Sequence, residues 1–225
     1  MNLFRDFGAA GDVLMNALMR VIPILICITF HELAHGYTAF RLGDRTAKDM
    51  GRLTLNPIKH IDIFGLIMMM LFRFGWAKPV PVNMHNFQRP KLYMAITAIA
   101  GPVSNIILAS VVLFLYGLFY EALGGDFSVG AGAIARELIE NTAIISVFLA
   151  VFNLMPIPPL DGSKVLFSLL PEDIYYKLMR YERFGIIILI LAINTSIFQN
   201  TIGKLAEAIF SSLVFFWETA YRFVN

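Results

Sequence analysis

The sequence predicts an all-α polytopic membrane protein with five to six transmembrane helices and a short re-entrant segment that could include β-structure. The first reason is composition, because 58% of the 225 residues are hydrophobic and 15% are charged. Soluble domains contain about 45–50% apolar and about 25% charged residues. This chain therefore has too little polar surface to be a soluble globule or a disordered tail. Its formal net charge of +2 provides no electrostatic attraction to nucleic acid.

The second reason is a series of long apolar runs, each a candidate for one membrane crossing. Between Val13 and Phe40 the only charged residues are Arg20 and Glu32, and a helix of that length exceeds a hydrocarbon core of about 30 Å. This run is also too long for a cleavable signal peptide. Further runs follow at Leu92–Tyr120, Leu138–Leu160 and Phe184–Gly203, and a weaker run at Leu205–Trp217 could either cross the membrane or lie at its interface.

The third reason is the charge of the connecting segments, which also indicates the topology. Basic residues are concentrated in connections 41–60, 73–91 and 161–183, whereas connection 121–137 carries more acidic than basic residues. Because basic loops remain in the cytoplasm, we expect the first three connections inside and the last outside. The run Ile61–Phe72 then has both ends on one side and is too short for a crossing, so we expect it to be re-entrant or interfacial. The first helix runs from outside to inside.

The residues His31-Glu32-Leu33-Ala34-His35 form an H-E-x-x-H motif in the inner half of the first run. On a helix, residues four positions apart project from the same face, so both imidazoles can reach one metal ion. Glu32 projects about 100° away from His31, beside the metal, where it can accept a proton from water as a catalytic base. Burying a glutamate within an apolar span costs ~3 kcal/mol even on a lenient insertion scale, which favours a functional role over an accidental polar patch.

A catalytic zinc ion needs a third protein ligand and one open position for water. The candidates elsewhere in the chain are Asp161, Asp62, His60, His85 and Cys27. Asp161 follows the run Leu138–Leu160 at the same depth as the motif, and prolines at 156, 158 and 159 force the chain out of helix just before it. Irregular backbone at this depth is tolerated only against protein or a water-filled cavity, so Asp161 is the best candidate. Its alternative roles are a helix cap or a partner for Lys164.

Three motifs, in order along the chain, resemble those of the site-2 protease family of intramembrane zinc metalloproteases. They are His31–His35 in the first span, Ala100–Asn105 in the next and Asn153–Gly162 at the end of the third. The stretches Leu42–Pro57 and Gly75–Asn83 resemble the compact prokaryotic branch of that family. We therefore expect neither a PDZ module nor a nucleotide-sensing domain.

The resemblance implies zinc bound by His31, His35 and Asp161, with Glu32 as the catalytic base. It implies hydrolysis of peptide bonds in transmembrane segments near the cytosolic face, which is regulated intramembrane proteolysis. Transmembrane protein or peptide substrates and the lipid bilayer are the expected partners.

The same resemblance implies a multi-pass protein of the prokaryotic plasma membrane with its active site toward the cytoplasm. We expect one domain over residues 1–225, with a catalytic core at about 13–170 and accessory C-terminal helices at about 184–223. The alternative function is a zinc-binding membrane protein without turnover, such as a metal transporter or a substrate-holding adaptor. A transporter would distribute acidic or histidine residues across the span, and their clustering at one depth favours the enzyme.

Four residues are candidates for substrate contact, namely Asn105, Asn153, Val80 and Val82. The two amides lie within apolar spans, where they could hold the substrate as an oxyanion-type donor would or form hydrogen bonds between helices. In the stretch Pro79-Val80-Pro81-Val82 the prolines remove the N–H groups from one strand edge. The valine N–H groups on the other edge could pair with an unwound substrate. The alternative for this stretch is a rigid interfacial loop.

Overall fold

The computed structural model describes residues 3–62, 64–65, 78–120 and 130–224. Within these ranges the chain is mostly helical and forms no strand, so the helical class is confirmed and the expected β-structure is not. Most of the predicted re-entrant segment Ile61–Phe72 lies outside the described residues. At its margins, the Lys78 N–H donates to the His60 carbonyl at 3.0 Å, so the chain enters and leaves this region at neighbouring points.

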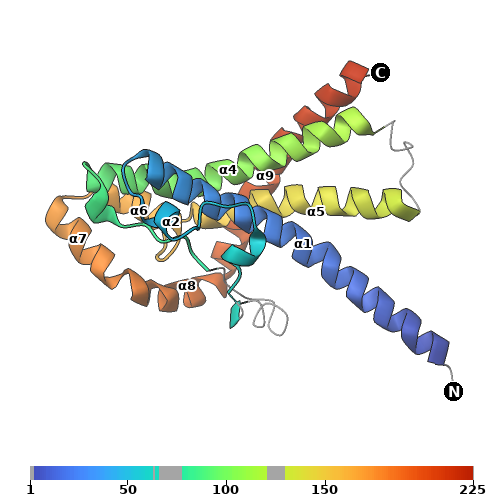
Figure 1. Cartoon of the computed structure of the whole chain (residues 1–225), viewed down its shortest axis with the longest axis horizontal. Coiled ribbons are helices and arrows are strands. Elements are labelled where there is room, and N and C mark those ends of the chain that lie inside the picture. The colour runs from blue at the N-terminus through green and yellow to red at the C-terminus, as the bar shows by residue number, and fades with distance from the viewer. Residues whose placement is uncertain (1–2, 63, 66–77, 121–129, 225) are drawn as a thin grey trace.

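Four long helices form the body of the protein, and α4 is at their centre (Figure 1). They are α1 (Leu3–Arg41), α4 (Pro90–Phe119), α5 (Gly130–Asn153) and α9 (Ser196–Val224). α4 packs against the other three, while α5 also packs against α1 and α9. Small residues such as Ala109 and Ala143 are fully buried in the core between these helices, which allows the backbones to approach closely.

The described helices support two to three membrane spans, so the expectation of five to six is not confirmed. Two helical segments, Ala17–Arg41 and Pro90–Phe119, are long and apolar enough to cross a membrane. α8 (Gly185–Ile193) and α9 pass the same test together as one bent pair. The run predicted at Leu138–Leu160 is shortened because α5 ends at Asn153, where the proline-rich stretch begins to exclude helical hydrogen bonding.

The predicted boundary between the last two runs, at Gly203, is wrong. The helix breaks instead after Ile193, and the axes of α8 and α9 differ in direction by 81°. Thr195 explains the break, because its hydroxyl oxygen accepts a hydrogen bond from the Phe198 N–H at 3.3 Å and so caps the first turn of α9. Hydropathy does not register a cap of this kind, although the polar cluster Asn194-Thr195-Ser196 is a signal that could have located it.

The short helices α2, α6 and α7 lie at the end of the bundle away from both chain termini (Figure 1), and further short elements occur in the same connections. The short elements are α2 (Thr46–Asp49), η1 (Pro57–His60), η2 (Met84–Asn86), α6 (Asp161–Ser168), α7 (Glu172–Tyr181) and η3 (Glu182–Phe184). α6 packs against α4, and both α2 and η1 pack against α1. Segments that are far apart in the sequence therefore meet here, because α2 follows α1, η2 precedes α4 and α6 follows α5.

Candidate metal centre

His31, His35 and Asp161 meet where α1, α4 and α6 come together, and all three side chains are buried. The His31 Nε2 and His35 Nε2 atoms are 3.0 Å apart, and they lie 3.2 and 3.1 Å from Asp161 Oδ2. Ligands about 2.0–2.1 Å from a tetrahedral zinc ion lie roughly 3.3 Å from one another. The three atoms therefore have the spacing of a zinc site with one position left open.

The other ring nitrogen of each histidine is also held in place. His35 Nδ1 is 2.7 Å from the Thr97 carbonyl oxygen, so Nδ1 carries the proton and Nε2, on the side of Asp161, keeps its lone pair free for a metal ion. His31 Nδ1 is 3.2 Å from the Asn105 amide nitrogen, while the buried Asn105 Oδ1 has no partner among the described residues. Exchanging the amide oxygen and nitrogen, an assignment made from hydrogen bonding, lets His31 Nδ1–H donate to Oδ1. Both imidazoles are then oriented as metal ligands usually are.

Gly101 of α4 allows the two imidazoles to pack directly against that helix. A Cβ atom at this position would overlap the rings of both His35 and His31. Glycine is the residue that permits this close approach, so Gly101 shapes the space around the ligand set.

Glu32 lies beside the ligand set and is not part of it. Its Oε2 accepts a hydrogen bond from the Val80 N–H at 2.7 Å. The expectation that this N–H lies on a free strand edge is therefore wrong for this structure, because Glu32 already occupies it. The Val82 N–H has no hydrogen-bond partner within the described ranges, so only this part of the predicted edge remains open.

Three charged side chains hold the segment Lys78–Asn83, which carries that edge. Arg52 Nη2 donates to the Lys78 carbonyl at 2.8 Å, and the Asn83 N–H donates to Asp44 Oδ2 at 2.7 Å. Glu32 holds the middle of the segment at Val80. The extended stretch is thus held at both ends and, at Val80, by the Glu32 carboxylate.

Asp44 is fully buried, and its carboxylate accepts several hydrogen bonds. Burial by itself raises the pKa of Asp44, but hydrogen bonds from the Thr46 hydroxyl, the Asn86 amide and the backbone N–H groups of Asn83 and Thr46 outweigh it and keep this pKa below its usual value. Sequence reasoning missed Asp44 and Arg52. The spacing of Asp44 and Thr46 is typical of an Asx-turn and could have indicated the first of them.

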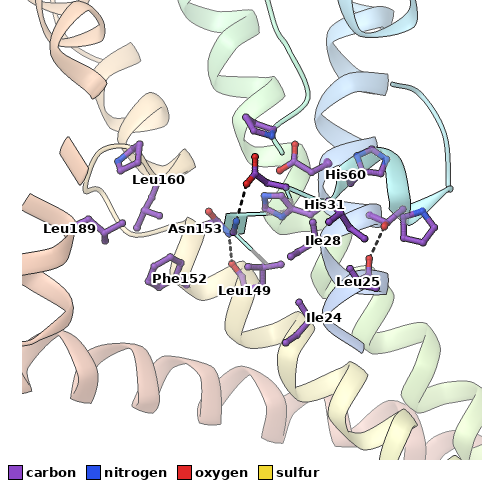
Figure 2. A pocket seen from close by; sticks show the side chains of 18 of the residues that line it. Ile24, Leu25, Ile28, His31, His60, Leu149, Phe152, Asn153, Leu160 and Leu189 are labelled. Carbon is purple, nitrogen blue, oxygen red and sulfur yellow. Dashed lines mark hydrogen bonds between the residues drawn. The ribbon is translucent and has the colours of Figure 1, made fainter. Parts of the chain in front are cut away.

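Two cavities meet at the ligand set. The apolar cavity, of about 480 Å³, lies between α1, α5 and α8 and is lined by residues such as Ile24, Ile28 and Leu189 (Figure 2). The polar cavity, of about 460 Å³, extends on the other side toward Lys164 and Glu182. His31, Glu32, Pro79, Asn153 and Pro159 line both cavities.

The structure separates the two asparagines that were candidates for substrate contact. Asn153 lies where the cavities meet, and its amide donates to the Leu149 carbonyl at 2.9 Å. Asn105 is fully buried and lines neither cavity, and its polar contact is with His31. Asn105 therefore makes the contact between helices that was its alternative role, and no cavity contact supports a substrate role for it.

The other residues that were candidate metal ligands do not belong to the ligand set of His31, His35 and Asp161. Cys27 Sγ is 3.1 Å from the Ser146 hydroxyl oxygen, and His60 Nε2 is 2.9 Å from the Thr54 carbonyl oxygen. Asp62 accepts from the Gly65 N–H at 2.9 Å, and His85 is exposed. Thr97, whose carbonyl orients His35, gave no signal in the sequence because a backbone oxygen carries no residue-type signature.

Residues 19–198 match the profile described as Peptidase family M50. The chain belongs to this family. As an M50 peptidase, it falls in the site-2 protease group, so the resemblance found in the sequence is confirmed. The matched region contains the apolar part of α1, both later motifs and all three residues of the ligand set.

Three curated relatives of this M50 peptidase share the printed name "Putative zinc metalloprotease", followed by YwhC, Rip2 or MJ0611. YwhC, from Bacillus subtilis, is 38% identical over 205 residues, which cover 86% of this chain and 93% of the relative. Rip2, from Mycobacterium tuberculosis, is 28% identical over 77% of this chain and 66% of its own length. MJ0611, from Methanocaldococcus jannaschii, is 31% identical over 66% of this chain and 69% of its own. No solved structure matches the chain.

Family membership, the buried donor set and the apolar helices together describe a membrane metalloprotease. The metal indicated by two imidazoles, one carboxylate and the names of the relatives is zinc. The residues present fit it, because the ligand atoms are correctly spaced, both histidines are oriented and Gly101 leaves room for the rings.

Proposed function

We propose that this M50 peptidase is an intramembrane zinc endopeptidase that hydrolyses peptide bonds within transmembrane segments of other proteins, near the cytosolic face. One observation carries the proposal: the ligand set, whose two histidines lie on the apolar helix α1, opens at His31 onto an apolar cavity between α1, α5 and α8. A cavity of this character can receive the side chains of a membrane-embedded peptide. A soluble substrate would not require it.

His31, His35 and Asp161 would hold the zinc ion. When bound in such a site, zinc polarises a carbonyl group and activates water at neutral pH. Glu32 has one carboxylate oxygen bonded to the Val80 N–H, which orients the side chain, while the other oxygen can accept a proton from the attacking water. Glu32 then passes that proton to the leaving amine.

A peptide bond inside a helix is shielded, so the target segment must be extended before attack. The Val82 N–H can pair with such an extended backbone, as an added strand pairs with a sheet edge. Asn153 lies at the junction of the two cavities, where its side chain can contact the substrate backbone near the scissile bond. Val80 assists indirectly, since its N–H holds the catalytic carboxylate.

The polar cavity can supply water, because it extends from the ligand set to the charged residues Lys164 and Glu182. The positions of the basic connections favour an active site facing the cytoplasm in a prokaryotic plasma membrane, with several crossings. The hydrogen bond between Lys78 and His60 supports connections 41–60 and 73–91 lying on the same side. In that setting the enzyme would perform regulated intramembrane proteolysis.

The test is incubation of the purified protein with a panel of single-span membrane substrates, with Glu32→Gln as the matched inactive variant. Cleavage within the transmembrane segment by wild type, and none by the variant, is the expected result. Stoichiometric zinc without cleavage of any substrate would contradict the proposal and favour a zinc-binding protein without turnover. Cleavage restricted to soluble loops would contradict the intramembrane site.

A further inference from the structure

Lys164 lies on α6 one turn after Asp161, and its side chain reaches back to the same carboxylate. Lys164 Nζ is 3.4 Å from Asp161 Oδ1, whereas Asp161 Oδ2 lies close to both histidine Nε2 atoms. The two oxygens of Asp161 thus have different partners. Oδ2 faces the ligand set, and Oδ1 faces a cation.

Lys164 also contacts a second element. Its Nζ is 3.5 Å from Glu182 Oε1, and both side chains are mostly buried, with exposed fractions of 23% and 21%. Glu182 is the first residue of η3, which joins α7 to α8. The ammonium group therefore bridges the metal-ligand carboxylate and the α7–α8 junction.

The α7–α8 junction is packed closely against the segment that precedes Asp161. A Cβ atom on Gly185, the first residue of α8, would overlap Pro158. Farther along α8, Ile186 and Leu189 line the apolar cavity. A single short helix thus contacts the chain that carries a ligand and forms one wall of the apolar cavity.

We propose that Lys164 is a positioning residue that holds Asp161 as a metal ligand through one oxygen and, through Glu182, couples this ligand to the position of α8. The inference rests on the ligand set proposed above. A carboxylate that bound zinc through both oxygens would occupy the position that a catalytic site keeps open for water. Because Lys164 interacts with Oδ1, this oxygen does not bind the metal, and the fourth position stays open for water.

The experiment compares the purified full-length protein with Lys164→Met, Lys164→Arg, Glu182→Gln and the double variant Lys164→Met with Glu182→Gln. Lys177→Met is the matched control, because Lys177 is an exposed lysine on the neighbouring α7. Two readouts are independent of proteolysis: zinc retention against a competing chelator, and the visible absorption spectrum of the Co²⁺-substituted protein, which reports the number of metal ligands.

Lys164→Met should weaken zinc affinity by about 10–100-fold, the usual cost of losing a group that orients a ligand. Its Co²⁺ bands should weaken as a second carboxylate oxygen joins the metal. Lys164→Arg, which keeps the charge, should recover most of the affinity. Glu182→Gln should give a smaller loss in the same direction, and the double variant should be no worse than Lys164→Met alone, because the two residues act in one network.

Wild-type affinity and spectrum in Lys164→Met would overturn the positioning role. Strictly additive losses in the double variant would overturn the coupling through Glu182. Two other results would show that the ligand assignment itself is wrong. They are a wild-type protein that binds no zinc and an Asp161→Ala variant that retains full zinc. Equal losses in Lys177→Met and Lys164→Met would show a general effect of surface charge and overturn the specific contact.

Discussion

At the scale of single residues, the site depends on which atom each side chain presents. The Thr97 carbonyl and the Asn105 amide hold the Nδ1 atoms, so both Nε2 atoms face Asp161. Glu32 has a separate position, because one of its oxygens is bonded to the Val80 N–H. The candidate metal ligands and the proposed proton acceptor are therefore distinct residues.

Replacing Glu32 by glutamine should separate metal binding from catalysis. The amide cannot accept the proton of water, so cleavage should fall by about 10²–10⁴-fold, while zinc content should remain near one ion per chain. Zinc is measured by metal analysis and cleavage with a single-span substrate. His31→Ala, which should lose both, is the control. Unchanged cleavage by Glu32→Gln, or zinc loss equal to that of His31→Ala, would contradict the assignment.

Replacing Gly101 by alanine should displace the histidine rings, since the added Cβ would overlap both of them. Zinc affinity should fall by at least about tenfold, because ligand atoms must be placed accurately to bind zinc. Competition with a chelator measures this loss. Gly203→Ala is the matched control, because a Cβ on Gly203 meets no atom within 4 Å. Equal zinc affinity in the two variants would show that α4 does not restrict the site.

At the scale of elements, the segment Lys78–Asn83 is an extended stretch fixed by side chains from elsewhere. Arg52, Glu32 and Asp44 each bond to its backbone. This anchoring keeps the Val82 N–H in a defined position although the segment belongs to no strand within the described residues. The position of the backbone that could pair with a substrate therefore depends on three charged side chains that are buried or half-buried.

Proline substitutions test the two N–H groups of this segment separately. Val80→Pro removes the donor that orients Glu32. A hydrogen bond to a charged group contributes about 1.5–3 kcal/mol, so kcat should fall by at least about tenfold. Val82→Pro removes the open N–H, so KM should rise instead. Val80→Ala and Val82→Ala keep the donors and should have small effects. Zinc content should be unchanged throughout, and wild-type kinetics in both proline variants would indicate a rigid loop only.

Replacing Asp44 by asparagine should destabilise the connection that follows α1. Hydrogen bonds to a charged group contribute about 1.5–3 kcal/mol each, so we expect a loss of about 3 kcal/mol, measured by thermal unfolding in detergent. Because the pKa of folded Asp44 is lowered, its stabilisation is fully present above about pH 4 and is lost as pH falls further. The difference in Tm between wild type and variant should shrink in acid. A difference independent of pH would contradict this role.

At the scale of the whole molecule, α4 organises the protein by packing against α1, α5, α6 and α9. It carries Gly101 beside the histidine rings and Thr97 at His35. The two histidines and the aspartate come from elements far apart in the chain. The ligand set therefore requires the packing of both α1 and α6 against α4.

The orientation of this bundle in the membrane can be tested with single cysteines in a Cys27→Ala background. Positions 78 and 177 lie in connections that contain several lysines and arginines, so they should react with an impermeant reagent only from the cytoplasmic side. Position 126, in the acidic connection, should react only from outside. Labelling of position 78 from outside would place the two connections around Ile61–Phe72 on opposite sides and contradict a re-entrant segment.

The sequence by itself determined the features that depend on short distances along the chain. Composition excluded a soluble protein, and the helical period placed His31 and His35 on one face with Glu32 beside them. The prolines before Asp161 indicated the end of α5 near that residue. A local signal was overlooked at Thr195, where a cap rather than hydropathy decides the helix boundary.

Only the tertiary structure decided which groups are already engaged, because those contacts join residues distant in sequence. The Val80 N–H and Glu32 are 48 positions apart, and Asn105 and His31 are 74 apart. No local pattern encodes either pair, so the sequence could not show that the Val80 N–H is bonded to Glu32 or that the Asn105 amide lies against His31. Packing of α4 against α1 brings Asn105 to His31, and the anchoring of the segment Lys78–Asn83 beside α1 brings the Val80 N–H to Glu32.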